Sequence, residues 1–327
     1  MGIHAKDRKI LYELEYDARK PLNEIAKATR MPKQVVSYRI NKMIETSIIR
    51  GFRTLIDIHR LGYFSYRIYF RLQDITPENE KILFDKLSRW KNIIWVIATT
   101  GRWDLEIVVA ARNNINFSNW LLELKKEMGD YIKEYTVSPS IVNYHFKRKY
   151  LAEKWEEEKV IPKYGFEPEV EKLDRIDFDI LKILATDAIA SYTEIGMKIG
   201  LTYNGVKKRI KSLEKRGIIQ AYRTWLNLDK MERKFYKAMI SISKFDEKIE
   251  KALLSFCIGE PTVVYLVECS GSWDIEIEAE VKDEFEFREL IVRFRNTFKD
   301  IVKDYEILHA YKELKLDYFP FESFEKL

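Results

Sequence analysis

The feature that most constrains the fold of this chain is an internal repeat with a period of 170 residues. Residues 7–54 align with residues 177–224 without a gap, and 15 of these 48 paired positions are identical. The same shift aligns two Gly-X-Trp-Asp segments, which occupy residues 101–104 and 271–274. A repeat this long has the size of a domain rather than of a solenoid unit. We therefore expect two similar folding units, produced when the gene for a smaller protein was doubled and fused.

The first third of each copy has the pattern of three short helices followed by a strand. In the second copy, DRIDFDILKILATDA has apolar residues at helical spacing, which predicts the first helix. Ser191 or Thr193 can cap a second helix that ends at Gly200. Thr202 can cap a third helix that ends at Gly217, and IIQAYRTWLNL then alternates as a strand. This order is typical of a winged helix-turn-helix domain, whose third helix enters the major groove of DNA. The alternative is a small helical module with a solvated lysine face.

The outward side chains of the third helix are candidates for DNA contact, and they differ between the copies. The first copy offers mostly uncharged, base-reading types and the second offers lysines, so we expect the two helices to read different sequences. Three arginines beside the following strand are predicted to contact phosphates, which fix register without reading sequence. The predicted DNA-binding residues are Lys33, Gln34, Ser37, Tyr38, Asn41, Arg50, Arg53, Tyr203, Asn204, Lys207, Lys208, Lys211 and Arg223. Arg39 and Arg209 border the buried side, where a phosphate contact and an internal salt bridge fit equally well.

The remaining two-thirds of each copy predict a strand, a helix, two strands, a helix and a strand. This βαββαβ order predicts a ferredoxin-like α+β domain, with the helices on one face of an antiparallel sheet. The Gly-X-Trp-Asp segments would form the central hairpin turns. Gly101 and Gly271 would supply positive φ, and Asp104 and Asp274 would cap the turns. We expect the two tryptophans to pack in the core or against the hairpin.

The repeat also sets the expected domain boundaries. The segment between the copies is polar and acidic and contains Pro162, Gly165 and Pro168, so we expect a linker. The α+β chain is then predicted to contain a winged helix-turn-helix domain at 1–54, a ferredoxin-like domain at 55–150, a linker at 151–172, a second winged helix-turn-helix domain at 173–224 and a second ferredoxin-like domain at 225–327.

The cysteine usage favours a cytoplasmic protein, whereas the charge balance leaves open whether it meets nucleic acid. Residues 1–150 carry 27 Lys and Arg against 17 Asp and Glu, a balance that attracts DNA but also serves solubility alone. No apolar run approaches the length of a membrane span, so we expect no membrane partner. The two cysteines and four histidines show no metal-ligand spacing, and no catalytic constellation stands out. We therefore expect no metal, no cofactor and no enzymatic activity.

The segment from LDRIDFDILKILATDA to KRGIIQAYRTWLNLD closely resembles the DNA-binding end of the Lrp/AsnC (feast–famine) transcription regulators. TTGRWD and CSGSWD resemble the Gly-X-X-Asp hairpin of that family's ferredoxin-like sensing domain, and the likeness extends over nearly all of both copies. The resemblance implies a tandem, fused member that binds double-stranded DNA and assembles as a homodimer or larger homo-oligomer through its sensing domains. It also implies an amino-acid effector near the hairpin, at Gly101, Asp104, Gly271 and Asp274.

The first copy departs from the family pattern in two places. Arg30, Met31 and Pro32 stand where the family has Gly-Leu-Ser, so this turn lacks its glycine and its capping hydroxyl. Ser47 stands where the second copy has Gly217. We therefore expect the first recognition helix to be altered or partly repurposed.

These observations predict a regulator in which the sensing domains of one chain pair with each other and hold two unlike winged helices, modulated by a small molecule such as an amino acid. One alternative is a tetrapyrrole enzyme, because siroheme decarboxylases share a similar plan. Against it, the chain has IIRGFRT in place of an Arg-Arg-Phe-Gly-like segment and lacks a His-Asn-Tyr run in its last strands. The other alternative is an adaptor that recruits the basal transcription machinery through the first winged helix.

Overall fold

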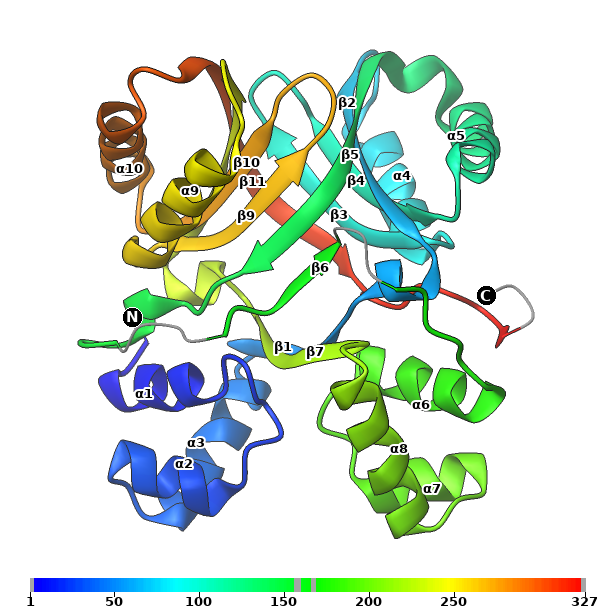
Figure 1. The fold of residues 1–327 in the computed structure, drawn as a ribbon, viewed down its shortest axis with the longest axis vertical. Coiled ribbons are helices and arrows are strands. Elements are labelled where there is room, and N and C mark those ends of the chain that lie inside the picture. The colour runs from blue at the N-terminus through cyan, green and yellow to red at the C-terminus, as the bar shows by residue number, and fades with distance from the viewer. Residues whose placement is uncertain (1–2, 156–159, 166–168, 325–327) are drawn as a thin grey trace.

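The computed structural model describes residues 3–155, 160–165 and 169–324 (Figure 1). Each copy begins with the predicted three helices and strand. These are α1 (Ala5–Glu13), α2 (Leu22–Thr29), α3 (Lys33–Glu45) and β1 (Ile49–Ile56) in the first copy, and α6 (Arg175–Thr186), α7 (Tyr192–Ile199), α8 (Tyr203–Lys215) and β7 (Ile219–Leu226) in the second. We call each set a winged module.

Each winged module is followed by a ferredoxin-like domain with the predicted βαββαβ order, which we call a sensing domain. The first contains β2 (Phe64–Leu72), α4 (Pro77–Arg89), β3 (Ile93–Thr100), β4 (Leu105–Ala111), α5 (Asn114–Met128) and β5 (Ile132–His145). The second contains β8 (Lys234–Ile242), α9 (Glu247–Gly259), β9 (Val263–Cys269), β10 (Ile275–Val281), α10 (Glu284–Thr297) and β11 (Val302–Leu316). The α+β fold predicted from the sequence is therefore confirmed.

The two sensing domains join through their sheets. Within each domain the strand order is β5-β2-β4-β3 or β11-β8-β10-β9, and all neighbours are antiparallel. The long last strand of each domain then continues onto the other domain, because β11 pairs with β3 and β5 pairs with β9. The strands therefore close into a ring in which each one has a neighbour on both sides, and helices α4, α5, α9 and α10 lie outside it (Figure 1).

The two winged modules lie side by side next to this ring, and their strands β1 and β7 meet in the middle (Figure 1). These strands form an antiparallel pair, here called the wing sheet, in which Arg53 lies opposite Arg223. The contacts obey the 170-residue repeat. The Ala18 N–H donates to the Tyr222 carbonyl at 2.8 Å, and the equivalent Ala188 N–H donates to the Phe52 carbonyl at 3.3 Å. Each winged module is thus docked on the wing strand of the other copy.

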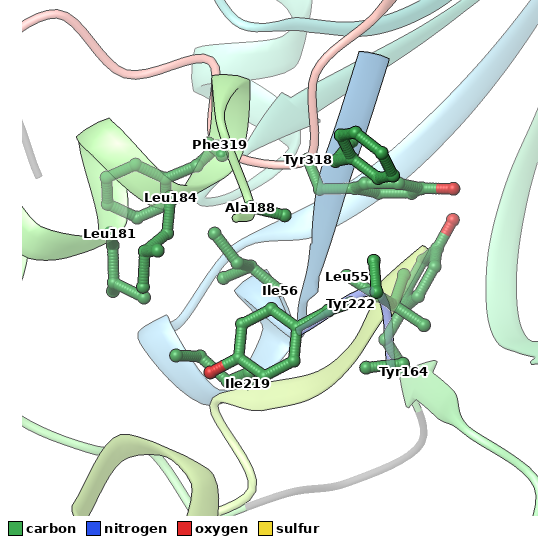
Figure 2. Close-up of a cluster of buried hydrophobic side chains, with 14 of the residues drawn as sticks. Leu55, Ile56, Tyr164, Leu181, Leu184, Ala188, Ile219, Tyr222, Tyr318 and Phe319 are labelled. Carbon is green, nitrogen blue, oxygen red and sulfur yellow. The ribbon is translucent and has the colours of Figure 1, made fainter. Parts of the chain in front are cut away.

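A shared hydrophobic core links the winged modules, whereas each sensing domain has a core of its own. The shared core contains the segment after β11, where Phe319 is fully buried. Figure 2 shows this residue beside Leu181 and Leu184 of the second winged module, in the same cluster as Ile56 and Ile219 of the wing sheet. The last residues of the second sensing domain therefore hold the second winged module in place.

The predicted linker at 151–172 contains structure that the sequence did not reveal. Lys163–Gly165 forms strand β6, which pairs antiparallel with β5 beside Val142 and Tyr144. Gly165 is required there because its φ is +106° and a side chain would clash with the Ile141 carbonyl. Residues 156–159 and 166–168 of the same predicted linker lie outside the described residues. In the described part of the chain, no helix is long and apolar enough to cross a membrane.

Candidate nucleic-acid interface and central cavity

The second winged module builds its recognition helix as the sequence predicts. Ser191 and Glu194 form a capping box at the start of α7, and Gly200 ends that helix with φ +72°. The Thr202 hydroxyl accepts the Gly205 N–H at 3.2 Å and caps α8. Helix α8 buries one face against the shared core, through Val206, Ile210 and Leu213. Its opposite face is left toward solvent.

Most of the predicted base-reading and phosphate-binding side chains lie on the surface. On α8, Tyr203 is 51% exposed, and Asn204, Lys208 and Lys211 are also exposed, while Lys207 is half-buried. On α3, Tyr38 is 63% exposed, and Lys33, Gln34 and Asn41 are exposed, while Ser37 is half-buried. The structure therefore brings each predicted set together on one helix face that a DNA duplex can reach.

The two arginines on the buried side of the recognition helices form internal ion pairs. Arg39 contacts Asp7 at 2.9 Å, and Arg209 contacts Asp177 at 3.1 Å and also Asp174. Of the two roles left open by the sequence, these contacts favour the salt bridge. In each module the pair ties the recognition helix to the first helix or its cap.

The arginines of the wing strands differ from expectation. Arg50 is exposed and stacks on Trp225, but Arg53 is half-buried, and Arg223 is only 4% exposed. The burial of Arg223 contradicts the predicted phosphate contact. Its guanidinium instead contacts Glu15 at 3.2 Å and donates to the Phe146 carbonyl at 3.0 Å. The cause is the pairing of β1 with β7, because directly opposite residues share one sheet face and this face is turned toward the sensing domains.

The Gly-X-Trp-Asp hairpins are held by contacts with neighbouring strands. The Asp104 carboxylate accepts the Leu72 N–H at 2.7 Å, and the equivalent Asp274 accepts the Ile242 N–H at 2.7 Å. The predicted cap thus acts on the adjacent strand rather than on the turn itself. Gly101 and Gly271 have φ of +133° and +154°, and they lie against the last strand of the other copy. Trp103 and Trp273 are buried in a small cluster between the sensing domains, as expected.

A buried ionic cluster lies where the two sensing domains meet. Arg67 donates to Glu106, Glu276 and Glu278, with each N–O distance 2.9 Å. Lys237, which stands at the same position of the second copy, contacts the same three carboxylates at 2.6 to 3.0 Å. All five side chains are buried, so three carboxylates face two cations.

The equivalent carboxylates of this cluster differ in pKa. Burial raises the pKa of Glu106, and Lys237 and Arg67 only partly offset that increase. Burial also acts to raise the pKa of Glu276, but Arg67 and Lys237 outweigh it, and the pKa falls to about 2. Glu276 additionally accepts the Tyr69 hydroxyl at 2.6 Å and the Trp273 indole N–H at 2.8 Å. The cluster therefore keeps Glu276 ionised to lower pH than Glu106, whose pKa is raised instead.

Arg67 and Glu278 of the ionic cluster lie in one wall of a cavity of about 490 Å³ between the wing sheet and the sensing sheets. Arg53, Arg223 and Trp225 line it from the wing strands, and Asn143 and Tyr265 line it from the sensing strands. Its His145 ring is neutral, because burial and then Arg223 hold the pKa of this imidazole well below its usual range. No local sequence pattern signals this cavity, because its walls come from both copies.

Comparison with known proteins decides the family. A family model described as winged helix-turn-helix DNA-binding matches residues 3–50 and 173–220. The HTH-type transcriptional regulator FL11 of Pyrococcus horikoshii is 30% identical over 115 residues, which are 35% of this chain and 75% of that protein. The regulatory protein AsnC of Haemophilus influenzae is 30% identical over 108 residues, which are 33% of this chain and 71% of that protein. The chain belongs to the Lrp/AsnC family of transcription regulators.

The tandem fold of this Lrp/AsnC protein also has a counterpart among solved structures. The siroheme decarboxylase NirDL superposes with a TM-score of 0.63, over 97% of this chain and 94% of that one, at 15% identity. At that identity the likeness concerns the fold. It shows that the arrangement of two winged modules and two sensing domains in one chain also occurs elsewhere.

The departures of the first copy from the Lrp/AsnC pattern have structural consequences. Arg30 ends α2 with φ 55°, and Ser47 follows α3 with φ 58°, where the second copy uses Gly200 and Gly217. Pro32 begins α3 and provides no side-chain cap. The first recognition helix thus keeps its position although two non-glycine residues adopt the left-handed conformation.

Proposed function

We propose that one chain of this Lrp/AsnC regulator acts as a pseudo-dimer that reads an asymmetric DNA site. The observation that supports this most directly is the wing sheet, which joins two winged modules of the same chain in antiparallel register around Arg53 and Arg223. In an ordinary two-fold dimer this arrangement presents the same helix twice and selects a palindrome. Here it presents α3 and α8, whose outer side chains are unlike.

The charges on the two helices suggest different tasks. The α8 face carries Lys207, Lys208 and Lys211, which suit phosphates and guanine edges. The α3 face carries Gln34 and Asn41, which suit adenine edges. Tethering both in one chain raises the effective concentration of the second helix once the first is bound. Together they would give sequence-specific binding with one half-site dominated by phosphate contacts.

The experiment is selection of bound fragments from a random duplex library, followed by footprinting and light scattering of the complex. The proposal expects an asymmetric site bound by one chain. A palindromic site bound by two chains, each using one copy, would contradict it. The same light scattering tests the prediction that further copies assemble through the sensing domains.

Small-molecule regulation through the hairpins stays a proposal that rests on the family resemblance. The Asp104 and Asp274 carboxylates already bind backbone N–H groups, so an amino acid at Gly101 or Gly271 would have to use the remaining carboxylate oxygens or the loop backbone. A thermal-shift screen of the twenty amino acids, with Asp104→Ala and Asp274→Ala as controls, tests this proposal. A shift that persists in the double variant, with both aspartates replaced, would exclude the hairpin carboxylates.

A tetrapyrrole enzyme is the second candidate function, because the fold likeness to NirDL covers nearly the whole chain. The regulator relatives and the winged helix-turn-helix matches weigh against it. The two functions differ in a simple observable. The freshly purified chain, and the chain after incubation with an iron porphyrin, should show no bound Soret band if it acts only as a regulator.

A further inference from the structure

The walls of the central cavity offer free hydrogen-bond donors. Among the residues that line it, the Asn143 side-chain N–H₂ and the Arg223 Nε–H are buried without a partner in the described part of the chain. Their side chains are 2% and 4% exposed. Unsatisfied buried polar groups are costly, and these two can be satisfied only by an acceptor. Within the described ranges, no lining residue has a buried side-chain acceptor atom that lacks a hydrogen-bond partner.

Three tyrosines add hydroxyl groups to the same wall. Tyr164, Tyr265 and Tyr318 line the cavity, and none of their hydroxyls forms a hydrogen bond with a described residue. Figure 2 shows Tyr164 and Tyr318 on the side of the hydrophobic cluster away from Leu181 and Leu184. These hydroxyls can donate to a ligand, and the rings give it apolar, planar surfaces to pack against.

The charge of the lining is strongly positive. Eight Lys and Arg residues line the cavity against four Asp and Glu residues. Many of these cations are neutralised by carboxylates, but among the described residues Arg53 forms its hydrogen bonds only with the backbone carbonyls of Phe52, Thr186 and Leu316. Its guanidinium lies over the Trp225 ring, 4.4 Å from the centroid. Arg53 therefore presents a charged donor group next to an aromatic surface.

We propose that the central cavity binds a planar organic anion, an aromatic carboxylate, as an effector of the regulator. A cavity of about 490 Å³ has the size of ordinary small-molecule sites. The carboxylate would accept from Arg53 and from the free N–H groups of Asn143 and Arg223. The aromatic body would pack between Trp225 and the tyrosines. The effector role rests on the proposed function, whereas the binding itself does not.

The position of the cavity explains how such a ligand would act on DNA binding. Arg53 and Arg223 stand opposite each other at the centre of the wing sheet. β1 follows α3 directly, and β7 follows α8 directly. A ligand that contacts these arginines from the side of the sensing domains would shift the preferred position of the wing sheet relative to those domains. Because both recognition helices are attached to that sheet, their relative placement would change with it.

The binding test uses two dyes with the same aromatic body. 8-Anilinonaphthalene-1-sulfonate is an aromatic anion, and N-phenyl-1-naphthylamine is its uncharged analogue. Titration of the intact chain, followed by dye fluorescence, should show saturable one-to-one binding of the anion that is competed by 1-naphthoate. The Arg53→Gln variant should weaken binding of the anion about tenfold, the usual effect of losing a charge-assisted hydrogen bond, and leave the uncharged dye unchanged.

Arg102→Gln is the matched control, because Arg102 also stacks on a tryptophan, Trp103, but lies outside the cavity. It should bind both dyes as the wild type does. A second variant, Asn143→Leu, should reduce anion binding without removing a charge. Thermal unfolding of each variant checks that it is folded. Equal affinities of both dyes, or anion binding unchanged in Arg53→Gln and Asn143→Leu, would overturn the proposal of an anion site.

The effector role has its own measurement. Saturating 1-naphthoate should change the affinity of the wild type for its selected duplex at least threefold, and the Arg53→Gln variant should need about tenfold more 1-naphthoate for the same change. Anion binding without any effect on DNA affinity would overturn the effector role. A chain that binds the anion but no duplex would instead contradict the proposed function and leave the site intact.

Discussion

The two winged modules share a fold and a set of buried contacts, yet they reach that fold differently. The second module uses Gly200, Thr202 and Gly217 at the positions where the chain must reverse or begin a helix. The first uses Arg30, Pro32 and Ser47 at the same positions. The difference teaches that the shared core and the wing sheet determine the position of these helices, while local turn and cap residues adjust their stability.

The two copies also differ in the ionic cluster between the sensing domains. Glu106 and Glu276 occupy equivalent positions, 170 residues apart, and both are buried between Arg67 and Lys237. Nevertheless their pKa values move in opposite directions. The second copy supplies one more carboxylate, Glu278, where the first has Val108. Glu276 and then Glu278 help to raise the pKa of Glu106, whereas hydrogen bonds from Tyr69 and Lys237 help to lower that of Glu276.

The largest expected effect is on stability in this cluster. Glu276→Gln should lower the free energy of unfolding by about 3 kcal/mol, because it leaves buried cations without their ionised partner. Glu106→Gln should lower it by less, because the raised pKa of Glu106 means that folding stabilises its ionised form less than it stabilises that of Glu276. Urea unfolding at neutral pH measures both. Equal losses in the two variants would show that the cluster is symmetric after all.

The pH dependence gives an independent check on the same pair. The pKa of Glu276 is lowered in the folded state from 4.5 to about 2, so its contribution is present above pH 4.5 and is lost as the pH falls toward 2. Glu276→Gln should flatten this part of the stability curve. The raised pKa of Glu106 has the opposite sign, because its contribution is present below its ordinary pKa and is lost as the pH rises.

The next largest effect concerns the lysine face of α8. Replacing Lys207, Lys208 and Lys211 by alanine should lower affinity for the selected duplex about 100-fold at moderate salt. It should also reduce the salt slope by up to about 3, since each lost phosphate contact removes about 0.9 from it. Fluorescence anisotropy at several salt concentrations measures both quantities. An unchanged slope would mean that these lysines do not contact phosphates.

The polar face of α3 should have a smaller and different effect. Replacing Gln34, Tyr38 and Asn41 by alanine should weaken binding to the selected site about tenfold and leave the salt slope unchanged. Competition with duplexes altered in one half-site then shows which half has lost its specificity. If this triple variant binds DNA as the wild type does, while the lysine variant of α8 does not, the result favours the adaptor interpretation of the first winged module.

The smallest effect tests the turn residues themselves. Arg30→Gly should stabilise the chain by about 0.5 kcal/mol, because glycine adopts the left-handed conformation without a steric penalty but gains entropy when unfolded. The reciprocal change, Gly200→Arg, should destabilise it by about 1 kcal/mol, since a Cβ at this position would meet no neighbour within 4 Å and only the backbone conformation is at issue. Thermal unfolding of the two variants compares the positions directly, and changes of the same sign would refute the interpretation.

Much of the fold could be predicted because its signals are local. Helical spacing, caps such as Thr202, and turns such as Gly101 are properties of a few neighbouring residues. Because the copies repeat every 170 residues, the elements predicted for one copy also apply to the aligned residues of the other. The family and the exposed faces of α3 and α8 followed from the same local patterns.

What could not be predicted depends on pairings between distant segments. From the sequence, Arg223 lies in a strand of alternating polar and apolar residues and is predicted to contact a phosphate. The pairing of β7 with β1 instead places its side chain toward Glu15 and the cavity. Strand β6 has three residues within a polar segment and is recognisable only from its place beside β5. The cavity itself needs the wing sheet, both sensing sheets and the last residues of the chain. Contacts between such distant segments cannot be inferred from local sequence patterns.

The ring of sensing strands has a consequence for gene dosage. Because each of its strands already has a neighbour on both sides, no strand edge among the described residues of the ring is left for a related regulator to replace one half. Mixed assemblies with paralogues are thereby disfavoured. Where one chain supplies both winged modules, promoter occupancy rises with the first power of the number of molecules in the cell, rather than with the square, as for a protein that must first find its twin.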